Sequence, residues 1–204
     1  MGIRALVFDL GNVIVPFDFN NAYQRMEPLC GLDRGEIRTR ISSRDLARRL
    51  ESGQIEPLDF VDEMNDLLGT RLSYDEFREI WVSIFFERTL IPESFFAAAR
   101  EQFPLVLLSN TNAIHFDWIA ERFPVLGHFH GWTLSHKVGA QKPDPKIYAD
   151  AVRRAGVSPS ECFFTDDIPD YVAGARNFGM DAEQFTGYES LRAQLAARGI
   201  HIPE

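Results

Sequence analysis

Four short segments, far apart in the chain, carry side chains that could bind a phosphate group and a metal ion. They are ALVFDLGNVI with Asp9, LLSNTN with Ser109, QKPDPKIY with Lys142, and FFTDDIPD with Asp166 and Asp167. Carboxylates are the ligands that Mg²⁺ prefers, whereas hydroxyl, amide and ammonium groups neutralise phosphate oxygens. Together the four segments predict a catalytic pocket.

From Phe95 onward, short apolar runs alternate with helical patterns. The apolar runs are PLVLLSN, GWTLS, ECFFTDD and a weaker one at residues 180–185, and the helical patterns include PKIYADAVRRAG and DYVAGARNFG. This alternation predicts a parallel sheet with helices on both faces. A first strand, expected from Ile3 to Phe8, belongs to the same sheet, although about eighty residues of different character follow it.

Those intervening residues, 18–89, predict a helical insertion. Their helical patterns include NNAYQRMEPLCG, LDFVDEMNDLLG and SYDEFREIWVSIFF, and Gly53 and Pro57 mark a turn between them. The predicted fold class is therefore α/β, with a Rossmann-like parallel sheet flanked by helices and an inserted helical cap. The core takes residues 1–17 and 90–204, and the cap takes residues 18–89.

Composition and charge argue against several classes of function. The chain has 204 residues, 45% hydrophobic and 25% charged, which suits one domain with a modest insertion. A formal net charge of -9 disfavours nucleic acid or an acidic membrane surface as partner, and no apolar run is long enough to cross a bilayer. Cys30 and Cys162 lack C-x-x-C spacing, and the first residues lack a secretory pattern. The expected compartment is the cytoplasm, and no oligomeric state is predicted.

The predicted sheet brings the polar residues together. Ligands bind beyond the carboxyl ends of the strands in open parallel sheets, and Asp9, Ser109 and Asp166 each end an apolar run. Asp9 is positioned as a nucleophile, because carboxylates of this kind form aspartyl-phosphates. Ser109, the backbone amide of Asn110, Lys142 and Mg²⁺ would neutralise the phosphate oxygens, with Asp9 and the acid pair starting at Asp166 binding the metal.

The four segments resemble, in order and spacing, the four motifs of the haloacid dehalogenase (HAD) superfamily, with a cap inserted after the first motif. Within that superfamily, the chain is similar to small bacterial phosphatases whose first motif has the sequence FDLGNV, a group that includes a sugar-1-phosphate phosphatase. The resemblance implies a C1-type cap and a Mg²⁺-dependent phosphomonoesterase acting on a small metabolite, such as a sugar phosphate.

Position by position, the resemblance also implies individual roles. Asp9 would be the nucleophile and a metal ligand, and Lys142 would clamp the nucleophile and the phosphate. The other predicted contacts are Gly11, Asn12, Ser109 and Asn110 at the phosphate, and Asp166, Asp167 and the carbonyl of Gly11 at the metal. Asp170 matches a third acidic position that orients the loop, although it could equally cap the following helix.

One position departs from the family pattern. Family phosphatases carry a second aspartate two residues after the nucleophile, as general acid and base, and here that position is Gly11. General acid–base catalysis contributes about 10² to 10⁴ in rate. We therefore expect a slow enzyme, a preference for good leaving groups such as anomeric sugar phosphates, or a substitute acid. Asp18 could be that acid if its loop folds over the pocket, or it could cap the first helix of the insertion.

Three functions compete for these motifs. A Mg²⁺-dependent phosphatase for small-molecule phosphate monoesters uses all of them. A 2-haloacid dehalogenase would attack carbon without a metal, which leaves the pair Asp166 and Asp167 with little purpose. A catalytically weakened phosphate-binding or regulatory protein is suggested by Gly11, but the retained Asp9 and Lys142 argue against it. The phosphatase is the prediction.

Overall fold

A five-stranded parallel sheet with the strand order β3-β2-β1-β4-β5 forms the centre of the computed structural model, which describes residues 2–203. The strands are β1 (Ala5–Phe8), β2 (Leu105–Ser109), β3 (Gly131–Leu134), β4 (Cys162–Asp166) and β5 (Asp181–Gln184). The first four strands lie in apolar runs of the sequence and β5 lies in the weaker run at residues 180–185. All the pairings are parallel, so the predicted parallel sheet is confirmed.

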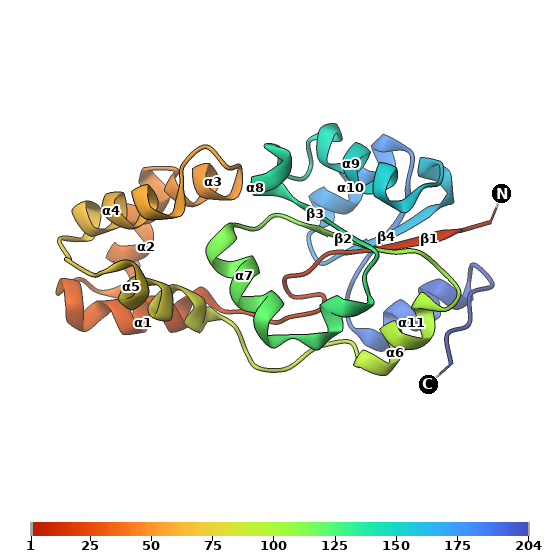
Figure 1. Cartoon of the computed structure of the whole chain (residues 1–204), viewed down its shortest axis with the longest axis horizontal. Coiled ribbons are helices and arrows are strands. Elements are labelled where there is room, and N and C mark those ends of the chain that lie inside the picture. Colours follow the sequence, from red (N-terminus) through yellow and green to blue (C-terminus); the bar gives the residue numbers. More distant parts are fainter. Residues whose placement is uncertain (1, 204) are drawn as a thin grey trace.

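Helices cover both faces of this sheet (Figure 1). One face packs against α9 (Pro145–Ala155) and α10 (Pro169–Phe178), and the other against α6 (Glu93–Arg100), α7 (Ala113–Arg122) and α11 (Tyr188–Ala196). Three 3₁₀ turns and a short helix complete the described elements: η1 (Val82–Ile84), η2 (Pro124–His128), η3 (Pro159–Glu161) and α8 (Ser135–Val138). Within residues 2–203, no helix is long and apolar enough to cross a membrane.

The side-chain pattern and the register of the central strand β1 determine where the carboxyl ends of the strands lie. Its side chains alternate, so that Leu6 and Phe8 pack on the side of α6 and α11, whereas Val7 packs on the side of α9 and α10. Phe8 pairs with Leu107 of β2 and with Thr165 of β4. The residues that follow each of these three therefore emerge side by side at one edge of the sheet.

A separate helical lobe lies at one end of the molecule, remote from both termini (Figure 1). Its helices are α1 (Phe19–Cys30), α2 (Arg34–Ser43), α3 (Leu46–Glu51), α4 (Pro57–Leu68) and α5 (Tyr74–Trp81). The predicted helical patterns correspond to α1, α4 and α5. No pattern indicated α2 or α3, because each buries only two residues, four positions apart, which is too few to define a helical period.

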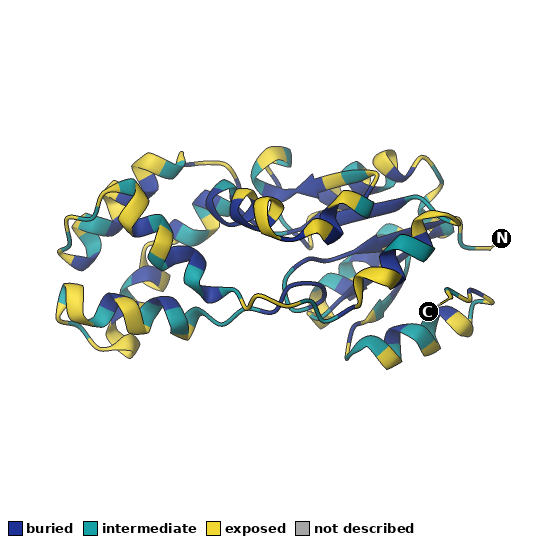
Figure 2. Cartoon of the chain, turned by 60° about the horizontal axis from the view of Figure 1, so that its bottom comes forward, coloured by how far each residue is buried: buried dark blue, intermediate teal, exposed yellow. Residues whose placement is uncertain are grey.

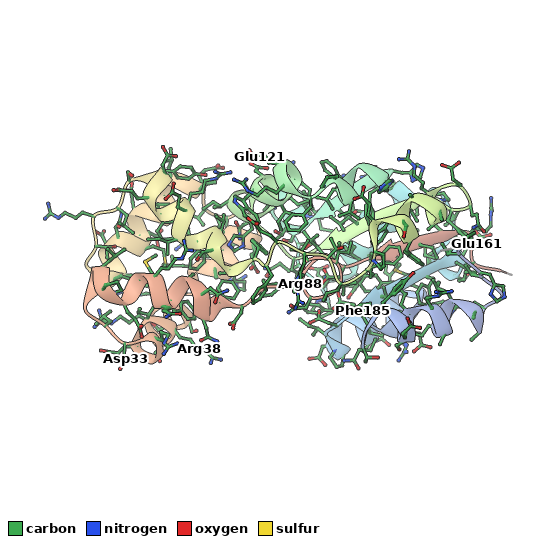
Figure 3. All side chains as sticks on the ribbon, turned by 90° about the horizontal axis from the view of Figure 1, so that it is seen from below. Asp33, Arg38, Arg88, Glu121, Glu161 and Phe185 are labelled. Atoms are coloured by element: carbon green, nitrogen blue, oxygen red, sulfur yellow. The ribbon has the colours of Figure 1, made fainter. Side chains whose placement is uncertain are left out.

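Two antiparallel segments connect the lobe to the sheet. Phe17 and Phe85 form an isolated β-bridge, and the backbone N–H of Asp18 donates to the carbonyl of Ile84 at 2.8 Å. Figure 3 shows Arg88 at this junction between the two parts of the molecule. Figure 2 shows that buried residues fill the sheet and the inner sides of the helices, whereas the outer surface of the lobe is largely exposed.

The structure separates two capping predictions made from the sequence. Asp18 is the N-cap of α1, and its carboxylate accepts a hydrogen bond from the backbone N–H of Asn20 at 2.9 Å, so the capping prediction is confirmed. The N-cap prediction for Asp170 is wrong. Helix α10 already begins at Pro169, with Ile168 as its N-cap, so Asp170 lies inside the first turn.

Candidate active site

A buried lysine lies between two carboxylates at the carboxyl edge of the sheet. Lys142 Nζ donates to Asp9 Oδ1 and to Asp166 Oδ2, each at 2.6 Å, and to the carbonyl of Leu108 at 3.2 Å. Asp9 directly follows β1, Asp166 ends β4, and both are almost inaccessible to solvent. The structure therefore brings together the three residues for which the sequence predicts the central chemistry.

Asn110 holds the backbone of this lysine in place. Its side-chain Oδ1 accepts from the N–H of Lys142 at 2.8 Å, and its Nδ2 donates to the carbonyl of Lys142 at 3.2 Å. Ser109, buried at the end of β2, immediately precedes it. This use of the Asn110 side chain was not predicted. The phosphate-binding roles of Ser109 and of the Asn110 amide stay predictions.

Burial and charge shift the pKa values of these groups. Burial raises the pKa of Asp9 to about 7, against the attraction of Lys142, and the nearby Asp166 raises it further. Burial alone would lower the pKa of Lys142, but the two carboxylates raise it, so this amine is charged. Burial and Asp166 also raise the pKa of Asp167. The cluster thus holds more negative charge than one ammonium group compensates.

The same carboxylates fit a divalent cation. Asp9, Asp166 and Asp167 each offer a ligand atom, and these atoms all lie within 4.8 Å of one another. When all are ionised, three carboxylates and one ammonium group leave a net charge of -2 (−3 + 1), which equals the charge that Mg²⁺ neutralises. Mg²⁺ is commonly bound by a few carboxylates and several waters. Both the donor atoms and the charge therefore suit magnesium.

The loop after Asp9 folds back on itself. Asn12 adopts a left-handed φ of 54°, its N–H donates to the carbonyl of Val15 at 3.0 Å, and its Oδ1 accepts from the N–H of Phe17 at 3.2 Å. Asn12 therefore shapes the loop. Its phosphate-binding role, and the phosphate and metal contacts of Gly11, stay predictions.

A small chamber lies above this loop, between the helical lobe and the sheet. Its polar lining consists of Glu51, Ser109, Asn110, Thr111 and His115, and the rest of its lining is Leu10, Gly11, Phe17, Phe19, Ile84, Phe85 and Ile119. Its volume is about 60 Å³, well below the roughly 300 to 1,000 Å³ of most small-molecule sites. As shaped in this structure, the chamber has room for little more than a phosphate group.

The contributions of His115 and Glu51 to the chamber were missed. His115 is buried and has a structural role. Its Nε2 lies 3.2 Å from the carbonyl oxygen of Trp81, and burial lowers its pKa to about 4, so the ring is neutral at pH 7. Glu51 ends the unpredicted helix α3, and no sequence motif marks it.

Gly11 has a steric role that the sequence did not indicate. A Cβ at this position would lie 2.6 Å from Cε1 of Phe17, whose ring packs edge-on against Phe19 and Phe85. The aspartate that family phosphatases carry at this position therefore cannot be accommodated unless Phe17 moves.

Gly11→Ala is accordingly expected to lower the free energy of unfolding by about 1 to 3 kcal/mol. The double variant Gly11→Ala/Phe17→Leu should lose less than the sum of its single changes, because the smaller side chain relieves the clash. Chemical denaturation measures both effects. Gly127→Ala is the control, since no heavy atom lies within 4 Å of its added Cβ. Strict additivity of the two changes would contradict the clash.

Comparisons with known proteins agree with this geometry. The haloacid dehalogenase-like hydrolase family matches residues 3–179 of the chain. A D-ribitol-5-phosphate phosphatase from Bacteroides thetaiotaomicron is 28% identical over 188 residues, which are 89% of this chain and 91% of that protein. A phosphatase from Mycobacterium tuberculosis is 28% identical over 195 residues, covering 89% of this chain and 87% of that one.

The fold is also similar to that of a solved HAD family enzyme from Bacteroides thetaiotaomicron in complex with magnesium and inorganic phosphate. The TM-score is 0.78 and the sequence identity is 26%, over 91% of this chain and 96% of that one.

Proposed function

The chain belongs to the haloacid dehalogenase-like hydrolase family, and from this premise we propose that it hydrolyses small-molecule phosphate monoesters with Mg²⁺, through an aspartyl-phosphate at Asp9. One observation carries the proposal. Lys142 ion-pairs with Asp9 and Asp166 at 2.6 Å each, and Asp167 adds a third carboxylate within metal-binding reach. A structural ion pair needs no third carboxylate beside it, whereas phosphoryl transfer needs a nucleophile, a cation clamp and a metal site together.

In the first step, transfer of the phosphoryl group to Asp9, each side chain has a separate role. Asp9 attacks phosphorus, and the bond between phosphorus and the ester oxygen breaks. Lys142 holds the nucleophile and neutralises a phosphate oxygen, while the Ser109 hydroxyl and the backbone amides of Gly11, Asn12 and Asn110 bind the others. Mg²⁺ would be held by Asp9, Asp166, Asp167 and the carbonyl of Gly11, and it supplies charge neutralisation for the phosphate when bound. In the second step, water attacks phosphorus and releases Asp9.

Residues 18–89 form, in this proposal, a C1-type cap that opens and closes over a core of residues 1–17 and 90–204. Met1 and Glu204 lie outside the described residues. Two observations support the division. Paired segments at Phe17 and Phe85 connect the cap to the core, and the chamber between them has a volume of only about 60 Å³, which is small for a metabolite. Closure excludes water from the transfer step.

The small chamber and the relatives support the proposed substrate class. A small metabolite phosphate, such as a sugar or sugar-alcohol phosphate, suits a site that must close, whereas a nucleic acid suits neither the chamber nor the net charge of -9. Two free cysteines, Cys30 and Cys162, fit the reducing conditions of the cytoplasm. The alternative 2-haloacid dehalogenase leaves the acid pair Asp166 and Asp167 without a role.

Phosphate release from a panel of small phosphate esters tests the proposal. The native protein should release phosphate with Mg²⁺ and lose this activity in EDTA, and it should release no halide from 2-chloropropionate. Added Mg²⁺ should restore turnover after EDTA treatment. Metal-independent halide release without phosphate release would assign the protein to the dehalogenases, and neither activity would favour the phosphate-binding alternative.

A further inference from the structure

Glu51 is an acidic side chain of the helical lobe that lies next to the candidate active site of the core. It ends α3, which contacts α8 of the core, and it lines the chamber together with Gly11, Ser109 and Asn110. Its Oε2 accepts a hydrogen bond at 2.9 Å from Nε2 of Gln141, a core residue 90 positions away and adjacent to Lys142. The carboxylate thus crosses from the cap to the catalytic edge of the sheet.

A glycine beside Glu51 allows this close approach. Gly53 has a φ of 67°, and a Cβ there would lie 2.3 Å from the carbonyl oxygen of His136 in α8. Any larger residue would push the lobe away from the core at this point. The contact between Glu51 and Gln141 is therefore part of a tight interface between the lobe and the core.

The surroundings keep Glu51 poised between its two protonation states near neutral pH. Burial raises its pKa to about 7, while the hydrogen bond from Gln141 and the charge of Lys142 lower it less strongly. Gln141 donates to one carboxylate oxygen only, and within residues 2–203 no donor bonds to Oε1. That oxygen is free to exchange a proton with a molecule in the chamber.

We propose that Glu51 is the general acid and base of the reaction. The cap supplies it in place of the aspartate that family phosphatases carry at the position of Gly11. This proposal rests on the proposed phosphatase function. It also explains how the reaction can proceed although Phe17 occupies the space that an acid at position 11 would need.

The two chemical steps balance with Glu51 in this role. In the first, Asp9 forms a bond to phosphorus, the bond to the ester oxygen breaks, and protonated Glu51 gives its proton to that leaving oxygen. In the second, ionised Glu51 takes a proton from water as the water oxygen bonds to phosphorus. The bond to Asp9 breaks, which regenerates the Asp9 carboxylate and protonated Glu51.

Other candidates for this role are engaged elsewhere. Asp18 caps α1 and does not line the chamber. His115 lines it, but burial lowers its pKa to about 4, and both ring nitrogens have partners in Asn112 and Trp81. Glu51 is the remaining acid on the chamber wall among the described residues.

The charged and titratable groups around Glu51 should not obscure its titration in the pH dependence of kcat. Lys142 and Tyr171 interact with it electrostatically, and burial raises the pKa of Tyr171. Across the interface, burial lowers the pKa of His136. Within α3, Arg48 and Arg49 pair with carboxylates outside the chamber, Asp45 and Glu63. Burial also raises the pKa of Asp9 to about 7 and raises that of Asp167. Saturating Mg²⁺ would hold both of these carboxylates ionised, which leaves Glu51 as the group expected to titrate near pH 7.

Leaving-group dependence gives the sharpest test. Glu51→Gln should lower kcat on glycerol phosphate, a poor leaving group that needs a proton, by about 10² to 10³-fold. On p-nitrophenyl phosphate, whose leaving group needs none, the variant should release one equivalent of nitrophenol at the native rate and then turn over slowly, because the base for the second step is missing. Glu56→Gln, at an exposed position in the same segment, is the matched control and should behave like native protein.

The pH dependence of kcat should run in opposite directions for the two substrates. On glycerol phosphate, kcat of the native protein should fall as pH rises through about 7, because the acid form is needed. On p-nitrophenyl phosphate, kcat should fall as pH drops below about 7, because the second step needs the base form. Glu51→Gln should lack both limbs. Formate added to Glu51→Ala should restore part of the lost rate.

The outcomes separate this inference from the proposed function. Equal losses on both esters with no burst would assign Glu51 to substrate positioning and overturn the inference. Unchanged kcat on glycerol phosphate in Glu51→Gln, with an active native protein, would also overturn it while the phosphatase stands. A native protein without Mg²⁺-dependent release would overturn both. Should Glu51→Gln fail to fold, the absence of formate rescue in a folded Glu51→Ala would count against the inference.

Discussion

Asp9→Asn is expected to release phosphate at least about 10⁴-fold more slowly than the native protein while remaining folded. Asparagine preserves the shape of the side chain and can still accept from Lys142, but its amide cannot attack phosphorus. Steady-state phosphate release on the best ester of the panel measures the loss. Asp62→Asn, an exposed position in the cap, is the control and should retain native activity.

Stability measurements distinguish this chemical loss from unfolding. In the fold, the pKa of Asp9 is about 7, above its ordinary 3.8, so ionising this carboxyl costs more in the folded than in the unfolded state. Asp9 therefore stabilises the fold most below pH 3.8 and loses this contribution as pH rises through 7. At pH 8 in EDTA, Asp9→Asn should melt at the native temperature or above. A variant that retains a tenth of the native rate would contradict the role of Asp9.

Lys142→Met should have the largest effect on stability together with a loss of activity. The change leaves Asp9 and Asp166 buried without the ammonium group that lies 2.6 Å from each. Removing one partner of a buried ion pair typically costs about 3 to 5 kcal/mol. Chemical denaturation in EDTA should show a loss in this range, and kcat should fall by more than about 10³-fold because the clamp on nucleophile and phosphate is gone.

Magnesium provides the internal control for that variant. It should stabilise Lys142→Met more than the native protein, because the cation then neutralises carboxylates that have lost their only ammonium partner. Lys137→Met, at an exposed position, should change stability by less than about 0.5 kcal/mol. A Lys142→Met protein as stable as native in EDTA would show that Lys142 does not balance the buried charge.

The central residues of the site could be predicted because they follow from the parallel direction of the strands. Asp9, Ser109 and Asp166 each end an apolar run, and parallel strands bring their carboxyl ends to one edge. The register that pairs Phe8 with Leu107 and Thr165 then sets Asp9 beside Asp166, with Ser109 one residue further along β2. Lys142 lies in a loop, and no strand pattern points to it, so its prediction depended on its place between the segments of Ser109 and Asp166.

The rest of the chamber depends on contacts that no local pattern encodes. Glu51 and Gln141 are 90 residues apart, and they meet because Gly53 lets the cap approach the core. The edge of Phe17 against Gly11 is likewise a product of the folded loop. Side-chain hydrogen bonds from Asn110 to the backbone of Lys142 cannot be told from a turn-forming asparagine in the sequence.

Together these contacts link the cap to the reaction. In this proposal the core holds the nucleophile Asp9, Lys142 and the metal ligands, and the cap supplies Glu51 when it closes over the chamber. Closure would then assemble the acid, exclude water and confine the substrate in one movement. The glycine at position 11 is in this view a consequence of a neighbouring aromatic residue, with the proton supplied from the opposite wall.

Isotope exchange into inorganic phosphate is the measurement that tests the covalent role of Asp9 most directly, because it needs no knowledge of the physiological substrate. Native protein with Mg²⁺ and ¹⁸O-labelled phosphate in ordinary water should lose the label progressively, since reversible formation of the aspartyl-phosphate releases a labelled oxygen as water. Asp9→Asn, and native protein in EDTA, should leave the label intact. Exchange that persists in Asp9→Asn, or native protein that hydrolyses an ester yet catalyses no exchange, would contradict the account.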